Sequence, residues 1–558
     1  MSAQAGLHGG FRQSMAWLHT WSGLVVGWLL FAIFLTGTLS FYQDEISVWM
    51  QPELHASVPD EHTPERAVAR LTTHAAGAQL WSITLPSERD PSVQLAWRMP
   101  DAAPGRQGVE RAVMDAGTGE LIEPRETRGG GFLYRFHFEL YGLDRLWARW
   151  VVGVATMVML VGLLTGVVTH KKIFKDFFTF RPGKQQRSWL DAHNATAVLA
   201  LPFHLIITYS GLLLLMYQLM PWPVDVAYPE DRNAYFAELR SGGGGGGGGR
   251  GGGGREGGPA RATAAPPAVV PMSPLLPMLE AAARQWPEHG VGSITITQPN
   301  TRRATVELRA RHGDSLLDRG QQDRLRFSGV TGERISDPDN TATPNAARGL
   351  YNSLTALHLL RFADPVLRAL FFVAGLMGTA MVATGVLLWF AKRAPERAKR
   401  NHTPAGHRLV HSLNVGTLAG MWIAIGAYFW ANRLLPVTLP DRSAWEIRVF
   451  FLAWGLALLH PWLRPAKRAW TEQLGIGGAL FVLAPALSAL TTGQHLPGHL
   501  LAGHTVVAGV ELTLLLTGAG LLWAAWRVQL HRPEVRQSRR NRSAPPSQGI
   551  APSPALSE

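Results

Sequence analysis

Residues 150–169, WVVGVATMVMLVGLLTGVVT, and residues 369–391, ALFFVAGLMGTAMVATGVLLWFA, are two uncharged apolar stretches with matching flanks. Each is long enough to cross about 30 Å of hydrocarbon as a helix. A histidine precedes each stretch, a Thr-Gly pair lies within it, and a basic loop and a second histidine follow. The marks are His137, Thr165-Gly166 and His193 in the first copy, and His358, Thr384-Gly385 and His411 in the second. The offsets of 221, 219 and 218 residues indicate an internal duplication.

Six further apolar runs extend this pattern to eight predicted membrane helices. The chain has 558 residues, of which 46% are hydrophobic and only 17% charged. The first run is too long for the core of a signal peptide, so we interpret it as a retained helix. The composition predicts a polytopic α-helical membrane protein, with the other spans at 21–42, 194–219, 409–432, 449–463, 474–492 and 503–526.

The distribution of Lys and Arg predicts the orientation. The loops 171–187 and 391–408 and the tail from Arg527 are strongly basic, and all three fall on one side of an eight-helix protein. We therefore expect both termini in the cytoplasm and the inserts 44–146 and 221–357 on the outer side of the membrane. The net charge of +13 is then mainly a topology signal, and nucleic-acid binding is not expected.

The two large inserts resemble each other. Each insert has a predicted helix followed by three predicted strands. In both inserts a Thr-Gly-Glu turn follows the last of these strands. The expected elements are 64–76, 79–85, 92–98 and 111–115 in the first insert, and 274–285, 293–297, 303–309 and 324–328 in the second. Two small α+β units therefore accompany the duplicated helices.

These patterns give the predicted domain organisation. Residues 241–258 are almost all glycine and form a linker, since no Gly-Lys-Ser/Thr follows as in a phosphate loop. The predicted segments are helix 1 at 12–43, the first α+β unit at 44–130, helices 2 and 3 at 131–220, the second unit at 221–349, helices 4 and 5 at 350–432, helices 6 to 8 at 433–530 and a disordered tail at 531–558.

The histidines are the candidate cofactor ligands. The chain has no cysteine, which excludes disulfides, Cys-ligated iron–sulfur clusters and covalent c-type haem. Two neutral imidazoles are a common ligand set for low-spin haem. We expect two haem b groups, one held by His137 and His358 and one by His193 and His411. Alternative ligands are His204, placed three turns after His193 on the same predicted helix, and His170, His19 and His407.

Each histidine also has a purely structural interpretation, as an interfacial or capping residue. The Thr-Gly pairs could serve helix packing alone. His495, His499 and His504 lie near the last helix, and Glu511 lies inside it. An acid in a membrane helix is a functional candidate, for quinone binding, proton transfer or a third metal site. An internal hydrogen-bonded pair of His504 and Glu511 is the simpler interpretation.

Several local motifs support a family resemblance. Leu18-His19-x-Trp21-x-Gly23-Leu24 opens the first helix, while Phe136-His137-x-x-Leu140 and Leu357-His358 precede the second and fourth. With the Thr-Gly pairs and the α+β units, residues 12–432 resemble the PepSY-associated transmembrane family. The resemblance implies an iron-regulated inner-membrane protein, and some members are haem-containing reductases of periplasmic ferric siderophores. The family's outer domain is also linked to peptidase inhibition.

The sequence thus predicts a transmembrane oxidoreductase that passes electrons outward to a ferric siderophore or chelate. No nicotinamide or flavin motif is visible, so the expected donor is quinol or a separate flavoprotein. Membrane lipid is the other expected partner. One alternative is a non-redox membrane protein whose PepSY domains bind or regulate a periplasmic protease or envelope partner. Another is a transporter for iron or a chelate, although the two halves start in the same orientation, unlike an inverted repeat.

Overall fold

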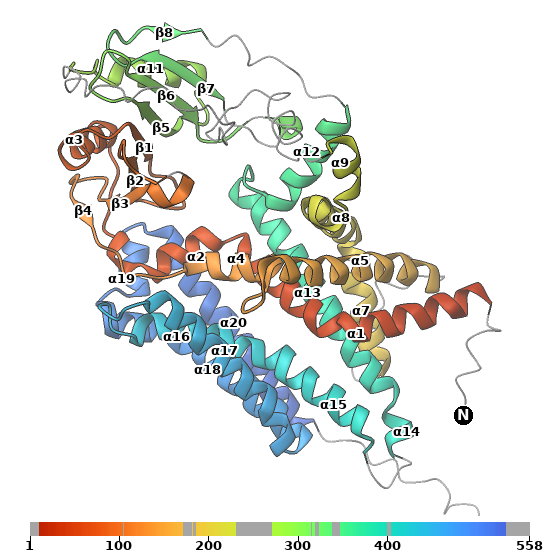
Figure 1. Ribbon diagram of the computed structural model, residues 1–558. Helices are drawn as coiled ribbons and strands as arrows, with labels where there is room; N and C mark the ends of the chain where they lie inside the picture. The colour runs from red at the N-terminus through yellow and green to blue at the C-terminus, as the bar shows by residue number, and fades with distance from the viewer. Residues whose placement is uncertain are drawn as a thin grey trace, which may run out of the picture.

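The computed structural model describes residues 10–103, 105–170, 181, 186–229, 231, 270–313, 315–318, 323–336, 346–398 and 403–531. Most of the predicted basic loop 171–187, the glycine linker 241–258 and nearly all of the predicted tail lie outside these residues. The described elements form a helical body with a sheet above it (Figure 1).

Eight helices of the described chain are long and apolar enough to span a membrane, as the sequence predicted. The sixth was predicted to begin at residue 449 but begins at Arg442, because its first turns carry a buried ion pair that an apolar pattern does not reveal. The spans are formed by α1 (Phe11–Ser40), α5 (Arg145–Thr169), α8 (Leu201–Leu219), α13 (Pro365–Lys392), α15 (Ala405–Asn414) continuing through a π-helical turn at Val415–Ala419 into α16 (Gly420–Leu434), α17 (Arg442–Leu463), α18 (Ala466–Thr492) and α20 (Thr505–Leu530).

The third predicted helix is divided into two. Helix α7 (Gln186–Leu199) ends and α8 begins after Ala200, whose φ of −110° and ψ of 21° are not helical. Pro202 lies in the first turn of α8, where its missing N–H costs least, and in a continuous helix its ring would clash with the preceding turn. The prediction that one unbroken helix stacks His193 and His204 on one face is therefore wrong.

The membrane helices up to α13, with the short helices α4 and α12, form two equivalent halves. The first half contains α1, α4 (Gly129–Glu139) and α5, and the second contains α7–α8, α12 (Ala346–Leu359) and α13. Helix α1 packs on α4, α5 and α13, while α8 packs on α12 and α5 and α7 packs on α13. The two halves thus exchange helix contacts about an approximate two-fold relationship, and Figure 1 shows α1, α5, α7 and α13 crossing one another.

The two α+β units join into one antiparallel sheet of eight strands in the order β4-β3-β2-β1-β5-β6-β7-β8. The central pair is β1 and β5, where Ile83 lies opposite Ile294. All predicted strands are present, and two short strands follow the Thr-Gly-Glu turns. The strands are β1 (Leu80–Thr84), β2 (Val93–Arg98), β3 (Glu110–Met114), β4 (Leu121–Ile122), β5 (Val291–Thr297), β6 (Thr305–Ala310), β7 (Arg324–Ser328) and β8 (Arg334–Ile335).

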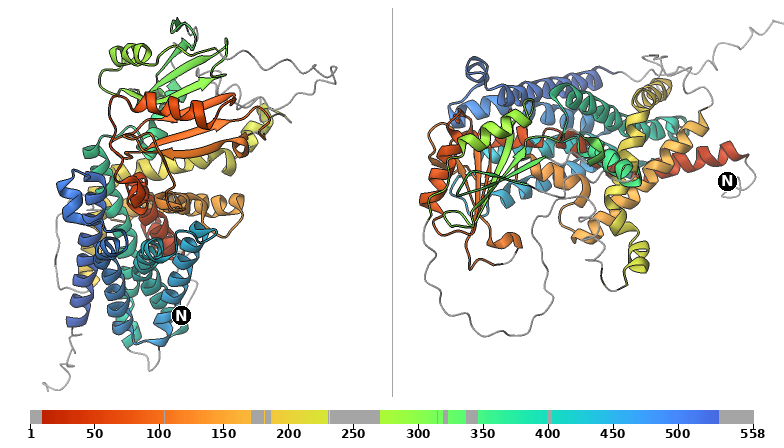
Figure 2. Two further views of the ribbon diagram at one scale, coloured as in Figure 1. Left: turned by 90° about the vertical axis from the view of Figure 1, so that its left-hand side faces the viewer. Right: turned by 90° about the horizontal axis from the view of Figure 1, so that it is seen from above.

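One face of the sheet carries the core of this layer. Helices α3 (Thr63–His74) and α11 (Leu276–Gln285) supply Leu71 and Met278 to a cluster that also contains Trp81 and Ile294. Alternate residues of β6 are buried on this side, so Glu307 and Arg309 point to the opposite face, which looks toward the membrane helices. The two views of Figure 2 show α3 and α11 on the outside of the sheet.

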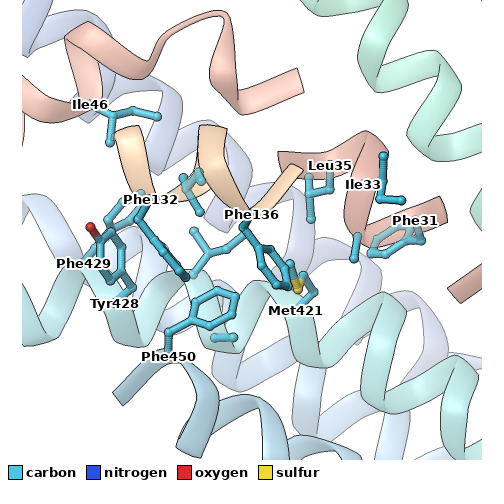
Figure 3. Close-up of a cluster of buried hydrophobic side chains, with 14 of the residues drawn as sticks. Phe31, Ile33, Leu35, Ile46, Phe132, Phe136, Met421, Tyr428, Phe429 and Phe450 are labelled. Atoms are coloured by element: carbon cyan, nitrogen blue, oxygen red, sulfur yellow. The ribbon is translucent and has the colours of Figure 1, made fainter. Parts of the chain in front are cut away.

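The last helices form a bundle against α2 (Gln43–Met50) and α4. The rings of Phe132 and Phe136 in α4 lie 5.0 and 5.8 Å from that of Phe450 in α17, and Phe132 also contacts Tyr428 of α16 (Figure 3). These rings supply the apolar burial that joins the bundle to the duplicated halves. The remaining short helices are α9 (Trp222–Ala227), α14 (Ala394–Ala398) and α19 (Leu496–Leu501).

Candidate paired-histidine site

His137 and His358 form the first pair of imidazoles, here called the sheet-side pair. His137 is near the end of α4 and His358 near the end of α12, and their ring centroids are 6.1 Å apart. Both line a cavity of about 1620 Å³ that the sheet closes from above. Burial lowers the pKa of His137, and burial followed by the nearby His137 lowers the pKa of His358 to about 3. Both rings are therefore neutral at physiological pH and can act as metal ligands.

His19 and His193 form the second pair, here called the distal pair. His19 lies in α1 and His193 in α7, with ring centroids 6.2 Å apart. Both line a cavity of about 250 Å³ whose walls are mostly apolar and glycine-rich, with Lys392 and Arg393 among the lining residues. Each pair thus takes one histidine from each half of the molecule.

All four imidazoles are held in the same way. In each case Nδ1 points at a main-chain carbonyl three residues before a Thr or Ser, and a glycine follows that hydroxyl residue. Side chains in a helix lean toward its N-terminus, so a residue without Cβ uncovers the carbonyl one turn earlier. The sets of histidine, carbonyl and glycine are His137 with Ile33 and Gly37, His19 with Gly162 and Gly166, His193 with Met381 and Gly385, and His358 with Ile207 and Gly211.

The distances show how tightly the rings fit. Nδ1 of His137, His19 and His193 lies 2.8, 2.9 and 2.8 Å from its carbonyl oxygen, while Nδ1 of His358 lies 2.9 Å from the hydroxyl of Ser210. A Cβ added at Gly37 would lie 2.5 Å from Nδ1 of His137. The Thr-Gly pairs therefore do more than allow helices to pack closely. Each pair binds the imidazole of a histidine from a neighbouring helix.

This anchoring determines the chemistry of the rings. A carbonyl oxygen can only accept, so Nδ1 carries the proton and Nε2 keeps its lone pair. Ligating histidines commonly donate their other ring nitrogen to a carbonyl in this manner, which fixes tautomer and orientation. Two imidazoles that face one metal ion across bonds of about 2 Å have centroids about 6 Å apart. Each pair could therefore hold one metal ion between its two rings, and the described residues contain no cluster of three or more His, Asp or Glu that could hold an ion by itself.

The other predicted ligands lie elsewhere. The structure does not bring His411 to His193: the His411 ring packs on Phe390 at 5.6 Å, and His407 packs on Trp389 at 5.8 Å. His204 is fully buried beside Phe34 and Phe203.

His170 lines the distal cavity, and its Nε2 accepts a hydrogen bond from Asn194 at 3.0 Å. That nitrogen is therefore already occupied, which leaves His19 as the residue that faces His193.

The histidines and the acid near the last helix lie apart from both pairs, and of these residues His499 and Glu511 are buried. Glu511 accepts a long hydrogen bond of 3.5 Å from Trp49, and His504 lies beside His499. The expected pair of His504 and Glu511 is thus not formed. His55, which the sequence did not single out, contacts the ring of His499 at 5.4 Å.

The comparison with known families covers the part of the chain that contains both histidine pairs. Residues 16–392 match the PepSY-associated TM region. The chain belongs to this family. The match includes His19 but ends before α15, so His411 lies outside the family region, which was expected to extend to residue 432. A Pseudomonas aeruginosa protein, named uncharacterized protein PA4219, is 26% identical over 401 residues, covering 68% of this chain and 90% of that protein.

The start of the repeat explains why His19, and not His411, lies beside His193 in this PepSY-associated chain. A repeat that starts at the second membrane helix makes His193 equivalent to His411. The structure instead makes His19 equivalent to His193 and Gly37 equivalent to Gly211, both at an offset of 174 residues. The available signal was the shared spacing of 18 residues from His19 to Gly37 and from His193 to Gly211. The repeat therefore begins at the first helix and not at the second.

Proposed function

We propose that this PepSY-associated protein is a membrane electron-transfer protein that holds two haem b groups and reduces a ferric chelate. The observation that carries the proposal is the pair of facing imidazoles that occurs twice, each ring fixed through Nδ1 and each pair built from both halves. The sheet-side pair would hold one haem and the distal pair the other. His19 replaces His411 in the proposed ligand set.

The side chains around each pair add support to the proposal. The four glycines let the rings pack closely against neighbouring helices, and the distal cavity is lined by residues such as Leu24, Leu30 and Leu163. An apolar setting excludes water and, with the anchored imidazoles, sets the reduction potential of a bound haem. Lys392 and Arg393 line one part of that cavity, where cations could neutralise carboxylate groups.

The sheet-side cavity is the proposed site of reduction. It is larger than a usual small-molecule pocket, which holds about 300–1,000 Å³, and it brings the sheet-side pair together with polar residues of the sheet. A bound haem supplies one electron at a time. One electron converts Fe(III) in the chelate to Fe(II), which hard oxygen ligands hold less tightly, so the iron can leave.

The proposed electron donor acts at the distal pair, on the opposite side from the sheet. Quinol or a separate flavoprotein would supply the electrons, and this side would face the cytoplasm of a bacterium with the sheet in the periplasm. The chain's own residues do three things in this scheme. They fix two imidazole pairs across the helices, surround the distal pair with mostly apolar side chains and leave the sheet-side pair beside a large cavity.

A reduced-minus-oxidised visible spectrum of the detergent-purified protein, with a pyridine haemochrome assay, tests the proposal directly. Two haems per chain and a sharp b-type band are expected. His137→Ala and His358→Ala should each remove the signal of the same haem. A folded protein that stays colourless after production with ample haem would overturn the proposal and favour the partner-binding alternative.

A further inference from the structure

Three histidines gather at the turn between the last two membrane helices, away from both histidine pairs. They are His495, His499 and His504, in the segment HLPGHLLAGH at 495–504. His495 caps α19, His499 lies within that short helix, and His504 precedes α20. Figure 1 shows α19 beside α2, on the side of the bundle nearest the sheet. None of the three lines the sheet-side cavity or the distal cavity.

The backbone turn brings two of these rings together. Gly503 adopts a φ of +75°, which reverses the chain after α19, and His504 N donates a hydrogen bond to His499 O at 2.9 Å. The reversal places Nδ1 of His499 at 3.4 Å from Nδ1 of His504. The ring centroids are 5.7 Å apart and the ring planes are tilted by 43°. Two ring nitrogens therefore converge on one point.

The separation of the two Nδ1 atoms distinguishes two interpretations of this contact. An N–H donor usually lies about 2.7–3.2 Å from an oxygen acceptor, so a hydrogen bond between the rings at 3.4 Å would be weak. Two nitrogens bound to one zinc ion at about 2.0–2.1 Å in tetrahedral geometry lie about 3.3–3.4 Å apart. The observed distance therefore fits a shared metal ion better than it fits a hydrogen bond.

The surroundings keep His499 in the protonation state that a metal ligand needs. His499 is 4% exposed, and the ring of His55 packs on it at 5.4 Å. Burial, followed by the nearby His504 and His495, lowers the pKa of His499, so this ring is neutral at physiological pH. His55 is not a ligand candidate, because its two ring nitrogens already contact a main-chain carbonyl and a glutamine side chain.

The protein would fill only part of the coordination sphere of such an ion. Within the described parts of the chain, no third His, Asp or Glu converges on the same point. His495 is exposed, and its Nδ1 accepts a hydrogen bond from Gly498 N at 2.9 Å. Structural zinc sites usually have four protein ligands, whereas sites with fewer keep positions for water. Two imidazoles are therefore typical of a site that exchanges its metal.

We propose that His499 and His504 bind a divalent transition-metal ion such as Zn²⁺ through their two Nδ1 atoms, with water in the other positions. Imidazole nitrogen suits Zn²⁺, Cu²⁺ and Ni²⁺, whereas Mg²⁺ and Ca²⁺ prefer oxygen ligands. The site does not depend on the proposed haem groups, and it lies beyond residue 392, where the family region ends. The last helices would thus add a second kind of metal site to the chain.

Equilibrium dialysis against zinc chloride tests the site. The full-length protein is purified without a histidine tag, placed in phosphatidylcholine nanodiscs and dialysed against micromolar zinc, and the bound zinc is counted by mass spectrometry. We expect one zinc ion per chain, which Cu²⁺ displaces and excess Mg²⁺ does not. Absence of bound zinc from the folded wild-type protein would overturn the inference.

Substitution of either ring should weaken zinc binding by about tenfold or more, because one of only two protein ligands is lost. His499→Ala, His504→Ala and the double variant should lose similar amounts, since the two nitrogens act as one chelating unit. His504→Gln is the variant for the case that the buried His499 cannot be replaced without unfolding, because His504 is only half-buried. Zinc content equal to that of the wild type in these variants would mean that the rings form only a hydrogen bond, which overturns the inference.

The matched control is His62→Ala. His62 is exposed, and its ring nitrogens lie 3.6 and 3.5 Å from carboxylate oxygens of Glu61 and Glu65, so it tests for adventitious binding at the surface. This variant should bind zinc as the wild type does. A loss of zinc confined to the His62 variant would show an adventitious ion only and would contradict the proposed site.

X-ray absorption at the zinc edge gives a second readout that does not depend on the folding of any variant. The wild-type protein loaded with zinc should show two imidazole ligands per ion, with oxygen ligands in the other positions. A spectrum that contains oxygen ligands alone would rule out coordination by His499 and His504.

Discussion

The imidazole of His19 faces that of His193 with a centroid separation of 6.2 Å, although the two residues begin different halves of the chain. Gly162 O holds the first ring and Met381 O the second, so each half also anchors one member of the pair. Each ring is therefore anchored within its own half, and both rings line the same cavity.

The first prediction separates His19 from His411 as a ligand. His19→Ala should remove the signal of the distal haem, because it deletes one of the two imidazoles that would hold this group. His411→Ala should leave both haems in place, because that ring packs on Phe390 away from the cavity. Haem content and the reduced spectrum of the two variants decide the question. Loss of one haem in the His411 variant, together with a normal spectrum in the His19 variant, would support the pairing of His193 with His411.

The second prediction concerns the glycine seats. Gly37→Ala places a Cβ 2.5 Å from Nδ1 of His137, which forces the ring to move. Overpacking of this kind costs about 1–3 kcal/mol. We expect a changed spectrum of the sheet-side haem and an unchanged distal haem.

The control for this substitution is Gly131→Ala in α4, where an added Cβ meets no atom within 4 Å. It should keep the wild-type spectrum. Identical spectra for both alanine variants would show that the seat at Gly37 does not position His137.

The third prediction tests whether the two α+β units fold as one sheet. Ile294→Ala removes a fully buried side chain at the β1–β5 junction, at a cost of about 2–5 kcal/mol. Because Ile83 is its register partner, amide hydrogen exchange should accelerate in β1 as well as in β5. Thr295→Ala, on the other face of the same strand, is the control. Exchange that rises only in the second unit would mean that the units are energetically independent.

The fourth prediction is a pH dependence at His55. Its side chain is buried between Val48 O and Gln494, and burial lowers its pKa from 6.5 to about 4. Between these two pH values the unfolded chain binds a proton that the folded protein does not. Stability should therefore be complete above about pH 6.5 and fall as the pH is lowered toward 4, by about 1–3 kcal/mol.

Thermal unfolding of the detergent-solubilised protein, measured from about pH 5 to about pH 8, tests this effect. This range brackets the usual histidine pKa of about 6.5. His55→Gln removes the titrating ring and should flatten the curve relative to wild type. Parallel curves for the two proteins would exclude His55 as the source of the pH dependence.

The elements that depend on local pattern could be predicted from the amino-acid sequence. Uncharged runs such as 150–169 predicted the eight spans, and alternating residues predicted the strands of both inserts. The Thr-Gly-Glu turns were equally local, since Gly119 and Gly332 both adopt a φ of +74° that other residues rarely take. His137 and His358 were paired correctly in space because they occupy the same place in two copies of one unit.

The histidine that lies beside His193 and the way in which the two inserts combine depend on long-range packing, which local sequence does not contain. The partner of His193 depends on where the repeat begins and on how α1 crosses α7 and α13, neither of which a local period contains. The joining of β1 to β5 depends on two strand edges that are far apart in the chain, each of which has backbone groups that must be paired. The helix breaks at Ala200 although the apolar pattern continues through this position. Pro202 has no backbone N–H to donate within a continuous helix, and a hydropathy pattern does not reflect this loss.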